Sequence, residues 1–368
     1  MFKNKITAIR VVLLILALAV VAVIVASIMT FSAGDDDEKV KIGCVLIGDT
    51  NDRGWNQSHI EGLRVAAGRL DCDLFYSKNV PEEKEACEKA VNSLLADGCS
   101  IIFLTSYGYG EISKDIARSN PNVAFFTISN SDDVRNMTTY FARLYQIRYL
   151  TGLVAGMTTR SGKIGYVASM ENSEVNRDIN AFALGVRKVN PDAKVVVSFT
   201  GSWNDEEKER ECARNLIDYG ADIITYHEDI DYATKEADSL GVYTIGYNVI
   251  YGKYSDKLLT AALFDWDEIY ENEITEFLKG KSSFSGGHWE GINDGAIRLS
   301  DFSNYVSEEA KRVVEEETNR LNAYWDIFSD RIIDNKGNVR CNNGERLSDD
   351  ELLYHMDWFV EGVEFYGK

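Results

Sequence analysis

The chain has 368 residues, of which 45% are hydrophobic and 27% charged, as is typical of a folded globular protein. This length is too great for most single hydrophobic cores, so we expect two lobes. The net charge of -20 argues against nucleic acid or an anionic lipid surface as a partner, because either would need a basic face.

The N-terminal segment differs in composition from the rest of the chain. Three basic residues within the first ten precede an apolar run over 11–29, and four acidic residues follow at 35–38. About twenty apolar residues suffice to cross a bilayer, and positive residues stay on the cytoplasmic side. We therefore expect 1–38 to be an anchor helix with an acidic linker, or alternatively a signal helix, in the cell membrane. The remainder would then be extracytoplasmic.

Alternating strand and helix patterns begin at residue 40. The apolar run over 40–47 predicts a buried strand, and from Asn56 onward apolar residues recur at helical spacing. Further strands are expected over 72–77, 100–105, 123–128 and 137–141, with helices over 81–97, 111–119 and 145–159. This alternation predicts a parallel sheet covered on both faces.

A second series of the same kind starts at residue 163. Strands are expected over 163–168, 194–200, 221–226, 242–247 and 258–263, and helices over 175–189, 205–219, 231–240, 266–279 and 307–328. Asn204 with Glu207, and Gly220 at the far end, are helix start and stop signals, and Ser348 with Glu351 predicts the start of a last helix. The sequence therefore predicts an α/β chain of two doubly wound, Rossmann-like lobes.

The lobes are expected to exchange segments. We assign 39–146 to lobe 1, with part of about 258–300 returning to it, and 147–257 to lobe 2, with part of about 300–368. The six cysteines and four histidines lack metal-site spacing, so we expect neither a metal ion nor another cofactor, and no obligatory disulfide. No P-loop, G-x-S-x-G or H-E-x-x-H motif occurs, so no catalytic residue is assigned.

The candidate site residues lie in loops that follow the predicted strands. Ligands of open α/β sheets bind at the carboxyl ends of the strands, and in a two-lobed protein these loops face one cleft. The first such loop carries Trp55 in what we expect to be an exposed position, although burial of its ring in a core is the alternative. The candidate ligand-binding residues are Asp52, Trp55, Asn56, His59, Tyr107, Glu111, Arg177, Trp203, Asp205, His227, Tyr247 and Asn248.

The aromatic residues in this set favour a flat ligand. Trp55 and Trp203 come from different lobes, and stacking of a base on an aromatic ring contributes roughly 1 to 3 kcal/mol. Asn and carboxylate side chains can bind ring nitrogens and exocyclic amines. A purine-like heterocycle fits this combination. Carboxylates near His59 or His227 could instead support acid–base catalysis, which is a weaker alternative.

Eight short motifs resemble those of a known family. They are DRGWNQ at 52–57, YLTG at 149–152, GKIG at 162–165, NAFALG at 180–185, GSWND at 201–205, GADI at 220–223, IGYN at 245–248 and MDWFVEGV at 356–363. In order and spacing they resemble the basic membrane protein (BMP) family of ABC-transporter substrate-binding proteins, which includes bacterial purine nucleoside receptors. The resemblance covers about residues 40–363.

The resemblance implies a type I periplasmic-binding-protein fold, in which two lobes joined by hinge strands close on the ligand. It implies that Trp55 and Trp203 stack on a base, that Asn56 binds its edge and that Glu111 pairs with ring nitrogens. The combination of Trp55 with His59 is most similar to the branch associated with adenine. The expected partner is an ABC permease, and the expected state is a monomer.

Two departures from the family concern the ribose. Ile250 and Phe264 occupy positions where nucleoside-binding members carry Asp and Lys. An apolar residue there would leave a ribose hydroxyl unpaired, at a cost of about 1 to 3 kcal/mol, so we expect a free base to be preferred over a nucleoside. The lipid-attachment Cys is also missing. The predicted function is a solute-binding protein for an adenine-like purine base or nucleoside; the alternatives are a membrane-anchored ligand sensor and a nucleoside-processing enzyme.

Overall fold

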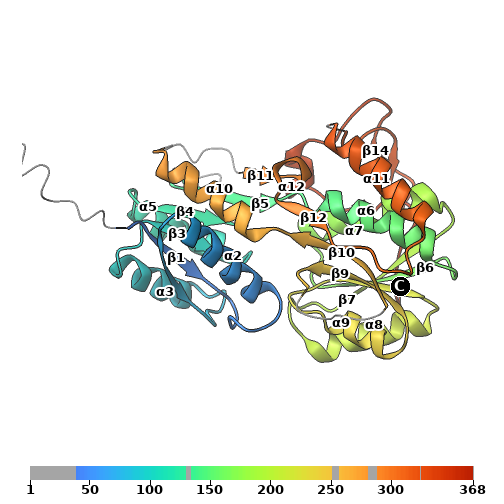
Figure 1. Cartoon of the computed structure of the whole chain (residues 1–368), viewed down its shortest axis with the longest axis horizontal. Helices are drawn as coiled ribbons and strands as arrows, with labels where there is room; N and C mark the ends of the chain where they lie inside the picture. Colours follow the sequence, from blue (N-terminus) through green and yellow to red (C-terminus); the bar gives the residue numbers. More distant parts are fainter. Residues whose placement is uncertain (1–38, 130–133, 251–256, 281–287, 324, 368) are drawn as a thin grey trace, which may run out of the picture. The chain divides into compact units, whose positions relative to one another are not determined.

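The computed structural model describes residues 39–129, 134–250, 257–280, 288–323 and 325–367. The anchor or signal helix expected over 1–38 lies outside these residues. Within the described ranges, no helix combines the length and the apolar character needed to cross a membrane. From Lys41 onward the chain forms one compact unit made of two lobes, each built on a mainly parallel sheet (Figure 1).

Lobe 1 is built on a six-stranded parallel sheet. Its strand order is β11 (His288–Glu290), β5 (Met137–Ala142), β4 (Ala124–Thr127), β3 (Ile101–Leu104), β1 (Lys41–Val45), β2 (Asp73–Ser77). Its helices are α2 (Trp55–Arg69), α3 (Lys84–Ala96), α4 (Tyr109–Ile112), α5 (Lys114–Ser119) and α10 (Trp266–Leu278). Ile102 and Leu104 of β3 pack in a buried cluster with α3, whereas the Phe103 ring lies 4.8 Å from that of Tyr270 in α10. The sheet is therefore covered on both faces, as its continuous apolar strands predict.

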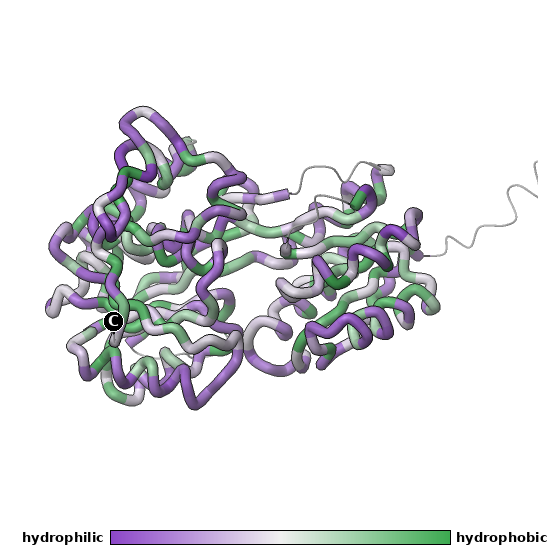
Figure 2. The backbone as a smooth tube through the Cα atoms, turned by 180° about the vertical axis from the view of Figure 1, so that it is seen from behind, coloured by the Kyte–Doolittle hydropathy of each residue, from purple (hydrophilic) through white to green (hydrophobic). Residues whose placement is uncertain are grey.

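Lobe 2 is built on a seven-stranded sheet. Its strand order is β12 (Ile297–Leu299), β10 (Leu258–Phe264), β9 (Tyr243–Asn248), β8 (Ile223–His227), β6 (Lys163–Ala168), β7 (Lys194–Phe199), β15 (Val363–Phe365). Only the pair between β10 and β12 is antiparallel. Its helices are α6 (Tyr145–Thr158), α7 (Ser173–Val189), α8 (Glu206–Asp218), α9 (Tyr232–Ser239), α11 (Glu308–Asn322) and α12 (Asp349–Tyr354). Hydrophobic stretches follow the strands in both lobes, and polar stretches follow many outward parts of the helices (Figure 2).

Helices α6 and α7 pack closely because a glycine in each helix faces the backbone of the other helix. A Cβ atom on Gly152 would lie 2.1 Å from the Phe182 carbonyl oxygen, and one on Gly185 would lie 2.1 Å from the Tyr149 carbonyl oxygen. Any larger residue would force the helices apart. This contact gives a physical reason for the glycines that end the YLTG and NAFALG motifs.

The chain passes between the lobes several times. After β5 it enters lobe 2, it returns after β10 to form α10 and β11 in lobe 1, and it then adds β12 to the sheet of lobe 2. The C-terminal part, with the hairpin β13 (Ile332–Ile333) and β14 (Val339–Cys341), follows α11. Asn180 of α7 holds this part through its side chain, donating to the Trp358 carbonyl oxygen (2.9 Å) and accepting from the Val360 N–H (2.8 Å). The MDWFVEGV and NAFALG motifs therefore contact each other.

Several helix limits differ from those expected. The N-cap of α8 is Asp205 and not Asn204, because the Asp205 carboxylate accepts the Lys208 N–H at 3.1 Å. Helix α11 ends at Asn322 rather than at Phe328. There the Asp326 side chain accepts the Phe328 N–H at 3.0 Å, which favours a turn over continued helix.

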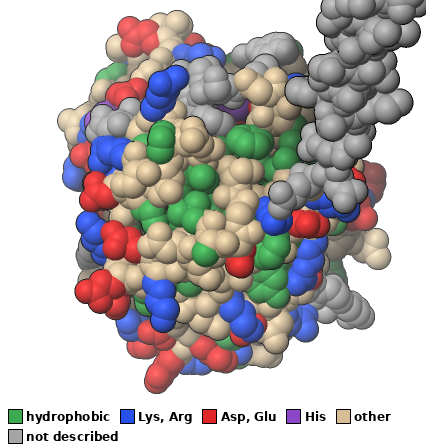
Figure 3. Space-filling view, turned by 90° about the vertical axis from the view of Figure 1, so that its left-hand side faces the viewer, with side chains coloured by type: hydrophobic (Ala, Val, Ile, Leu, Met, Phe, Trp, Pro, Cys, Tyr) green, Lys and Arg blue, Asp and Glu red, His purple; other side chains and the backbone are tan. Residues whose placement is uncertain are grey.

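One face of the molecule is drawn in Figure 3. Basic and acidic side chains are interspersed on it around a more hydrophobic centre. This face therefore lacks the extended basic area that a nucleic-acid backbone requires.

Candidate ligand-binding site

A cavity lies between the two lobes at the carboxyl ends of their strands. It contains about 370 Å³ of space free of protein atoms, counting its mouth to open solvent. Its lining residues are Trp55, Ser106, Tyr107, Ile128, Glu174, Trp203, His227, Glu228, Asp229 and Tyr247. The structure thus brings together five of the twelve candidates: Trp55, Tyr107, Trp203, His227 and Tyr247.

Trp55 is the first residue of α2 and is only 6% exposed, so the expectation of an exposed loop residue was wrong. Its indole N–H donates to the Thr105 carbonyl oxygen at 2.7 Å. Its ring meets those of His59 and Trp266 edge to face, with centroids 4.4 and 5.4 Å away. The aromatic neighbours bury most of Trp55 and fix its orientation, while part of it still lines the cavity.

The polar residues around Trp55 build the turn that positions it. The Asp52 carboxylate accepts the backbone N–H groups of Gly54, Asn56 and Gln57 at 2.9 to 3.0 Å and the Asn56 side-chain amide at 2.8 Å. The Asn56 side-chain oxygen in turn accepts the Gly48 N–H at 2.9 Å. Asp52 and Asn56 lie outside the cavity lining and use these atoms within lobe 1. A direct ligand contact by either residue stays a prediction.

His59 lies behind Trp55 in the core of lobe 1. It is fully buried, its Nδ1 atom bonds the Tyr270 hydroxyl, and Nε2 has no partner among the described residues. Burial keeps the pKa of His59 well below its ordinary value, so the ring is neutral near pH 7. The structure therefore places His59 as a packing partner of Trp55 and not in the cavity lining.

The two lobes touch directly at the Trp55 turn. The Trp55 backbone N–H donates to the Asp229 carbonyl oxygen in lobe 2 at 3.0 Å. A Cβ atom at Gly54 would lie 2.0 Å from that same oxygen, so only glycine permits this approach. The two lobes are thus in direct contact at this edge of the cavity.

In lobe 2, Trp203 and Asp229 are linked through the backbone. The Asp229 N–H donates to the Trp203 carbonyl oxygen at 2.9 Å, and the half-buried Trp203 ring lies 6.2 Å from the His227 ring. Trp203 follows β7 and Asp229 follows β8, so both are positioned by sheet strands. The cavity consequently has one tryptophan from each lobe.

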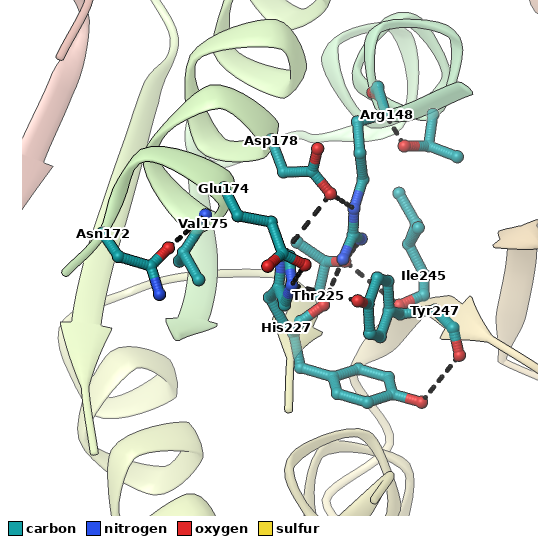
Figure 4. Close-up of polar contacts among 11 residues, drawn as sticks. Arg148, Asn172, Glu174, Val175, Asp178, Thr225, His227, Ile245 and Tyr247 are labelled. Atoms are coloured by element: carbon teal, nitrogen blue, oxygen red, sulfur yellow. Dashed lines mark hydrogen bonds and ion pairs between the residues drawn. The ribbon is translucent and has the colours of Figure 1, made fainter. Parts of the chain in front are cut away.

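A buried polar network holds His227 and Tyr247 in place (Figure 4). The Tyr247 hydroxyl lies 3.0 Å from His227 Nε2, and His227 Nδ1 lies 3.5 Å from Asp178. Asp178 pairs at 3.3 Å with Arg148, whose guanidinium lies 4.3 Å from the centre of the Tyr247 ring and donates to the Tyr226 carbonyl oxygen at 2.7 Å. Because each member contacts the next, His227 and Tyr247 are fixed before any ligand arrives.

Three lining residues that are not among the twelve candidates are acids. Glu174 is in the first turn of α7, and its carboxylate lies 3.6 Å from His227 Nε2. Glu228 and Asp229 directly follow β8. Burial raises the pKa of Glu228 well above its ordinary value, and Glu209 adds to the effect. Burial also raises the pKa of Asp229, with further contributions from Asp52 and other acids. Glu228 and Asp229 follow His227 at the carboxyl end of β8, and this position is the sequence signal for a cavity residue.

The remaining candidates lie elsewhere. The Glu111 side chain is 82% exposed and pairs with Lys114 at 2.6 Å, and Asp205 caps α8. Arg177 donates to the Leu352 carbonyl oxygen at 2.8 Å, and Asn248 accepts the Trp266 indole N–H at 3.0 Å. None of the four lines the cavity.

The positions linked to ribose binding are also outside the lining. Phe264 stacks on Trp266 with centroids 4.5 Å apart, and its ring lies 6.3 Å from the rings of Trp55 and Tyr247. It therefore packs behind two cavity residues, and the preference for a base over a nucleoside stays a prediction. Among the described residues, no group of three or more His, Cys, Asp or Glu side chains is arranged to hold a metal ion.

Several known proteins are similar to this chain. A purine-binding protein of Brucella abortus is 32% identical over 344 residues, 92% of this chain and 97% of that protein. A putative ABC transporter glucose-binding protein of Haloferax volcanii is 32% identical over 332 residues, 89% of this chain and 81% of the relative. The fold resembles that of a solute-binding protein of Aeropyrum pernix, with a TM-score of 0.67 at 18% identity over 77% of this chain and 92% of the other.

The family model described as PnrA-like ABC transporter substrate-binding protein matches residues 39–329. This match covers most of the chain and agrees with the resemblance found in the motifs. The protein therefore belongs to the Bmp family of ABC transporter substrate-binding proteins, whose members bind solutes and are not enzymes.

Proposed function

We propose that this protein is an extracytoplasmic receptor that binds a purine-like base between its lobes and delivers it to an ABC permease. The observation that carries the proposal is the pair of tryptophans, Trp55 and Trp203, at one cavity from opposite lobes. Both indoles line the cavity, and stacking of a base on an aromatic ring contributes roughly 1 to 3 kcal/mol. The purine-binding relative from Brucella abortus supports the same ligand class.

Uptake would proceed by hinge closure, with residues 1–38 anchoring the receptor and the protein acting as a monomer. The ligand would contact Trp55 in lobe 1 and Trp203 in lobe 2, so its binding would favour the closed state. The bond from the Trp55 N–H to the Asp229 carbonyl oxygen would form at the same time. A membrane-anchored sensor would use the same closure. Transport of the ligand by a complex of this protein with a permease would distinguish the transport receptor from the sensor.

A sugar is the second ligand class that an observation favours. The Haloferax volcanii relative is described as a putative glucose-binding protein, and carboxylates beside an aromatic ring also suit sugar hydroxyls. Both classes are therefore included in one titration. The full-length protein in detergent, stripped of carried-over ligand by unfolding and refolding, is titrated calorimetrically with adenine, guanine, hypoxanthine, their nucleosides and glucose.

The expected result is tight binding of a free base and no heat from glucose. Trp203→Ala should weaken base binding about tenfold, the size of a lost stacking contact, while Trp203→Phe keeps most of the affinity. Trp203 is the better position for this test because it is half-buried, whereas truncating Trp55 would also open the core. Binding of glucose alone, or an unchanged affinity of Trp203→Ala, would overturn the proposal.

A further inference from the structure

The cavity has a one-sided distribution of charge. Three of its ten lining residues are acids, and all three, Glu174, Glu228 and Asp229, belong to lobe 2. No lysine or arginine is among the described residues that line it. A ligand in this cavity therefore meets aromatic rings from both lobes but carboxyl groups from only one.

Glu228 has an unused oxygen atom. The residue is 1% exposed, and one carboxyl oxygen accepts the Thr200 hydroxyl at 2.9 Å. The other, Oε2, is buried and has no hydrogen-bond partner in the described chain, although the residue lines the cavity. Buried polar atoms are rarely left unpaired, because the unpaired state costs the full desolvation of the atom. The missing partner of Oε2 is thus expected to come from the ligand.

Asp229 is held next to Glu228 by its backbone. Its N–H donates to the Trp203 carbonyl oxygen and its carbonyl oxygen accepts the Trp55 N–H, so both flanking tryptophans fix its position. No described residue donates a hydrogen bond to its carboxyl group. Glu228 and Asp229 therefore line the same cavity as the two tryptophans proposed to stack on the ligand.

We propose that Glu228 and Asp229 bind the edge of an amino-substituted heterocycle that carries an exocyclic amine next to an unprotonated ring nitrogen. This inference depends on the proposed function, because it concerns the same cavity. The amine donates to a carboxyl oxygen, and a protonated carboxyl group donates its O–H to the ring nitrogen. Adenine presents this edge, and hypoxanthine does not.

The acid–base state of the pair fits this role. Burial raises the pKa of both carboxyl groups, and neighbouring acids raise it further: Glu209 for Glu228, and Asp52, Glu82 and Glu174 for Asp229. A carboxyl group that keeps its proton can act as donor and acceptor at once. In this proposal, Glu228 and Asp229 bind the ring nitrogens, a role that the family resemblance implied for Glu111. The Glu111 side chain lies on the surface.

The test compares two ligands of nearly the same shape on the full-length protein by calorimetry: adenine and 6-methylpurine. Both keep the purine ring for stacking. We expect adenine to bind at least about tenfold more tightly than 6-methylpurine, which lacks the amine. Equal binding of adenine and 6-methylpurine would overturn this inference and leave the proposed function intact. Binding of neither ligand would overturn both.

Variants of Glu228 then test whether this residue causes the preference for adenine. Glu228→Leu should still bind 6-methylpurine, and its affinities for adenine and 6-methylpurine should differ by less than about threefold. Glu228→Gln, which keeps a donor and an acceptor, should preserve most of the preference. The matched control is Glu211→Leu, an exposed position on α8, with an unchanged ratio. If a folded Glu228→Leu protein still preferred adenine as strongly as the unmodified protein, Glu228 would not be the residue that binds the amine. If Glu228→Leu does not fold, the comparison of ligands on the unmodified protein tests the inference.

Discussion

The two lobes contribute to the same cavity in opposite ways. In lobe 1 the polar groups of the turn that carries Trp55 are already paired: Asp52 accepts four hydrogen bonds, Asn56 is bonded to Gly48, and the Trp55 indole N–H is bonded to Thr105. In lobe 2 several buried polar atoms have no partner among the described residues, including Glu228 Oε2 at the cavity, Ser169 Oγ and both carboxyl oxygens of Glu209. Lobe 1 therefore supplies a fixed aromatic surface, whereas lobe 2 keeps polar capacity for a ligand.

This contrast suggests a division of labour in recognition. Paired groups hold a shape but cannot distinguish ligands by hydrogen bonding, whereas unpaired buried groups discriminate strongly between ligands that satisfy them and ligands that do not. Affinity from stacking would then involve both lobes, and selectivity would reside mainly in lobe 2.

The largest expected effect concerns an unpaired acid of lobe 2. Burial raises the pKa of Glu209 from its ordinary 4.5 to about 8, so the folded protein binds a proton between these values that the unfolded chain has released. The contribution of Glu209 to stability is complete below pH 4.5 and is lost as the pH rises to 8, by an amount on the order of 4 kcal/mol. Glu209→Gln should remove this loss.

Urea unfolding at pH 5 and pH 8.5 measures the change. The free energy of unfolding should fall with pH more steeply in the unmodified protein than in Glu209→Gln. The exposed Glu207→Gln on the same helix is the control. Identical pH dependence in all three proteins would show that Glu209 is not the buried, unpaired acid described above.

The second prediction breaks the paired network of lobe 1. Asp52→Ala leaves the backbone N–H groups of Gly54, Asn56 and Gln57 without their acceptor, which should cost about 3 kcal/mol of unfolding free energy and weaken ligand binding as the Trp55 turn loosens. Chemical denaturation and calorimetry measure the two effects. Asp49→Ala, which removes only an exposed pair with Lys78, should change neither. A stable Asp52→Ala protein with normal affinity would show that the turn does not need this cap.

The third prediction acts on the seam between the lobes. Gly54→Ala places a Cβ atom against the Asp229 carbonyl oxygen and should hinder closure, weakening ligand binding about thirtyfold, or roughly 2 kcal/mol. Small-angle scattering should show a smaller ligand-induced compaction, whereas Gly68→Ala, at a position with free space around it, should behave as the unmodified protein. Normal affinity of Gly54→Ala would mean that the ligand-bound state does not require this contact.

The sequence predicted the central strands of both sheets because each is a short apolar run followed by a helical pattern. The edge strands β11, β12 and β15 were missed, since each has three residues and includes polar ones, such as His288 and Glu364. Runs this short carry no periodicity, and they become strands only because a neighbouring edge is available for pairing. The return of the chain to lobe 1 and then to lobe 2 likewise involves pairing of β11 with β5 and of β12 with β10.

At the site, the twelve candidates chosen from the sequence include the aromatic lining residues but not the lining acids. Trp203 and Tyr247 are conspicuous beside predicted strands, but Glu228 and Asp229 are two of 59 acidic residues, most of which suit a solvated surface. Asp52 and Asn56 were identified as ligand contacts because their chemistry fits a base, whereas the structure uses the same chemistry to cap a helix. A residue type alone does not distinguish these uses; burial and partners do.

The position of β15 has a consequence for how the chain folds. This strand is the last described element in chain order, and it pairs with β7 and completes the edge of the lobe 2 sheet. Until residues 363–365 are available, the edge of β7 is an unpaired row of backbone donors and acceptors, which is a template for aggregation. Lobe 1 has its first five strands by residue 142 and lacks only β11. Lobe 2 should therefore be the late and aggregation-prone step of folding, and deletion of residues 363–365 should lower the yield of soluble protein before it alters the cavity.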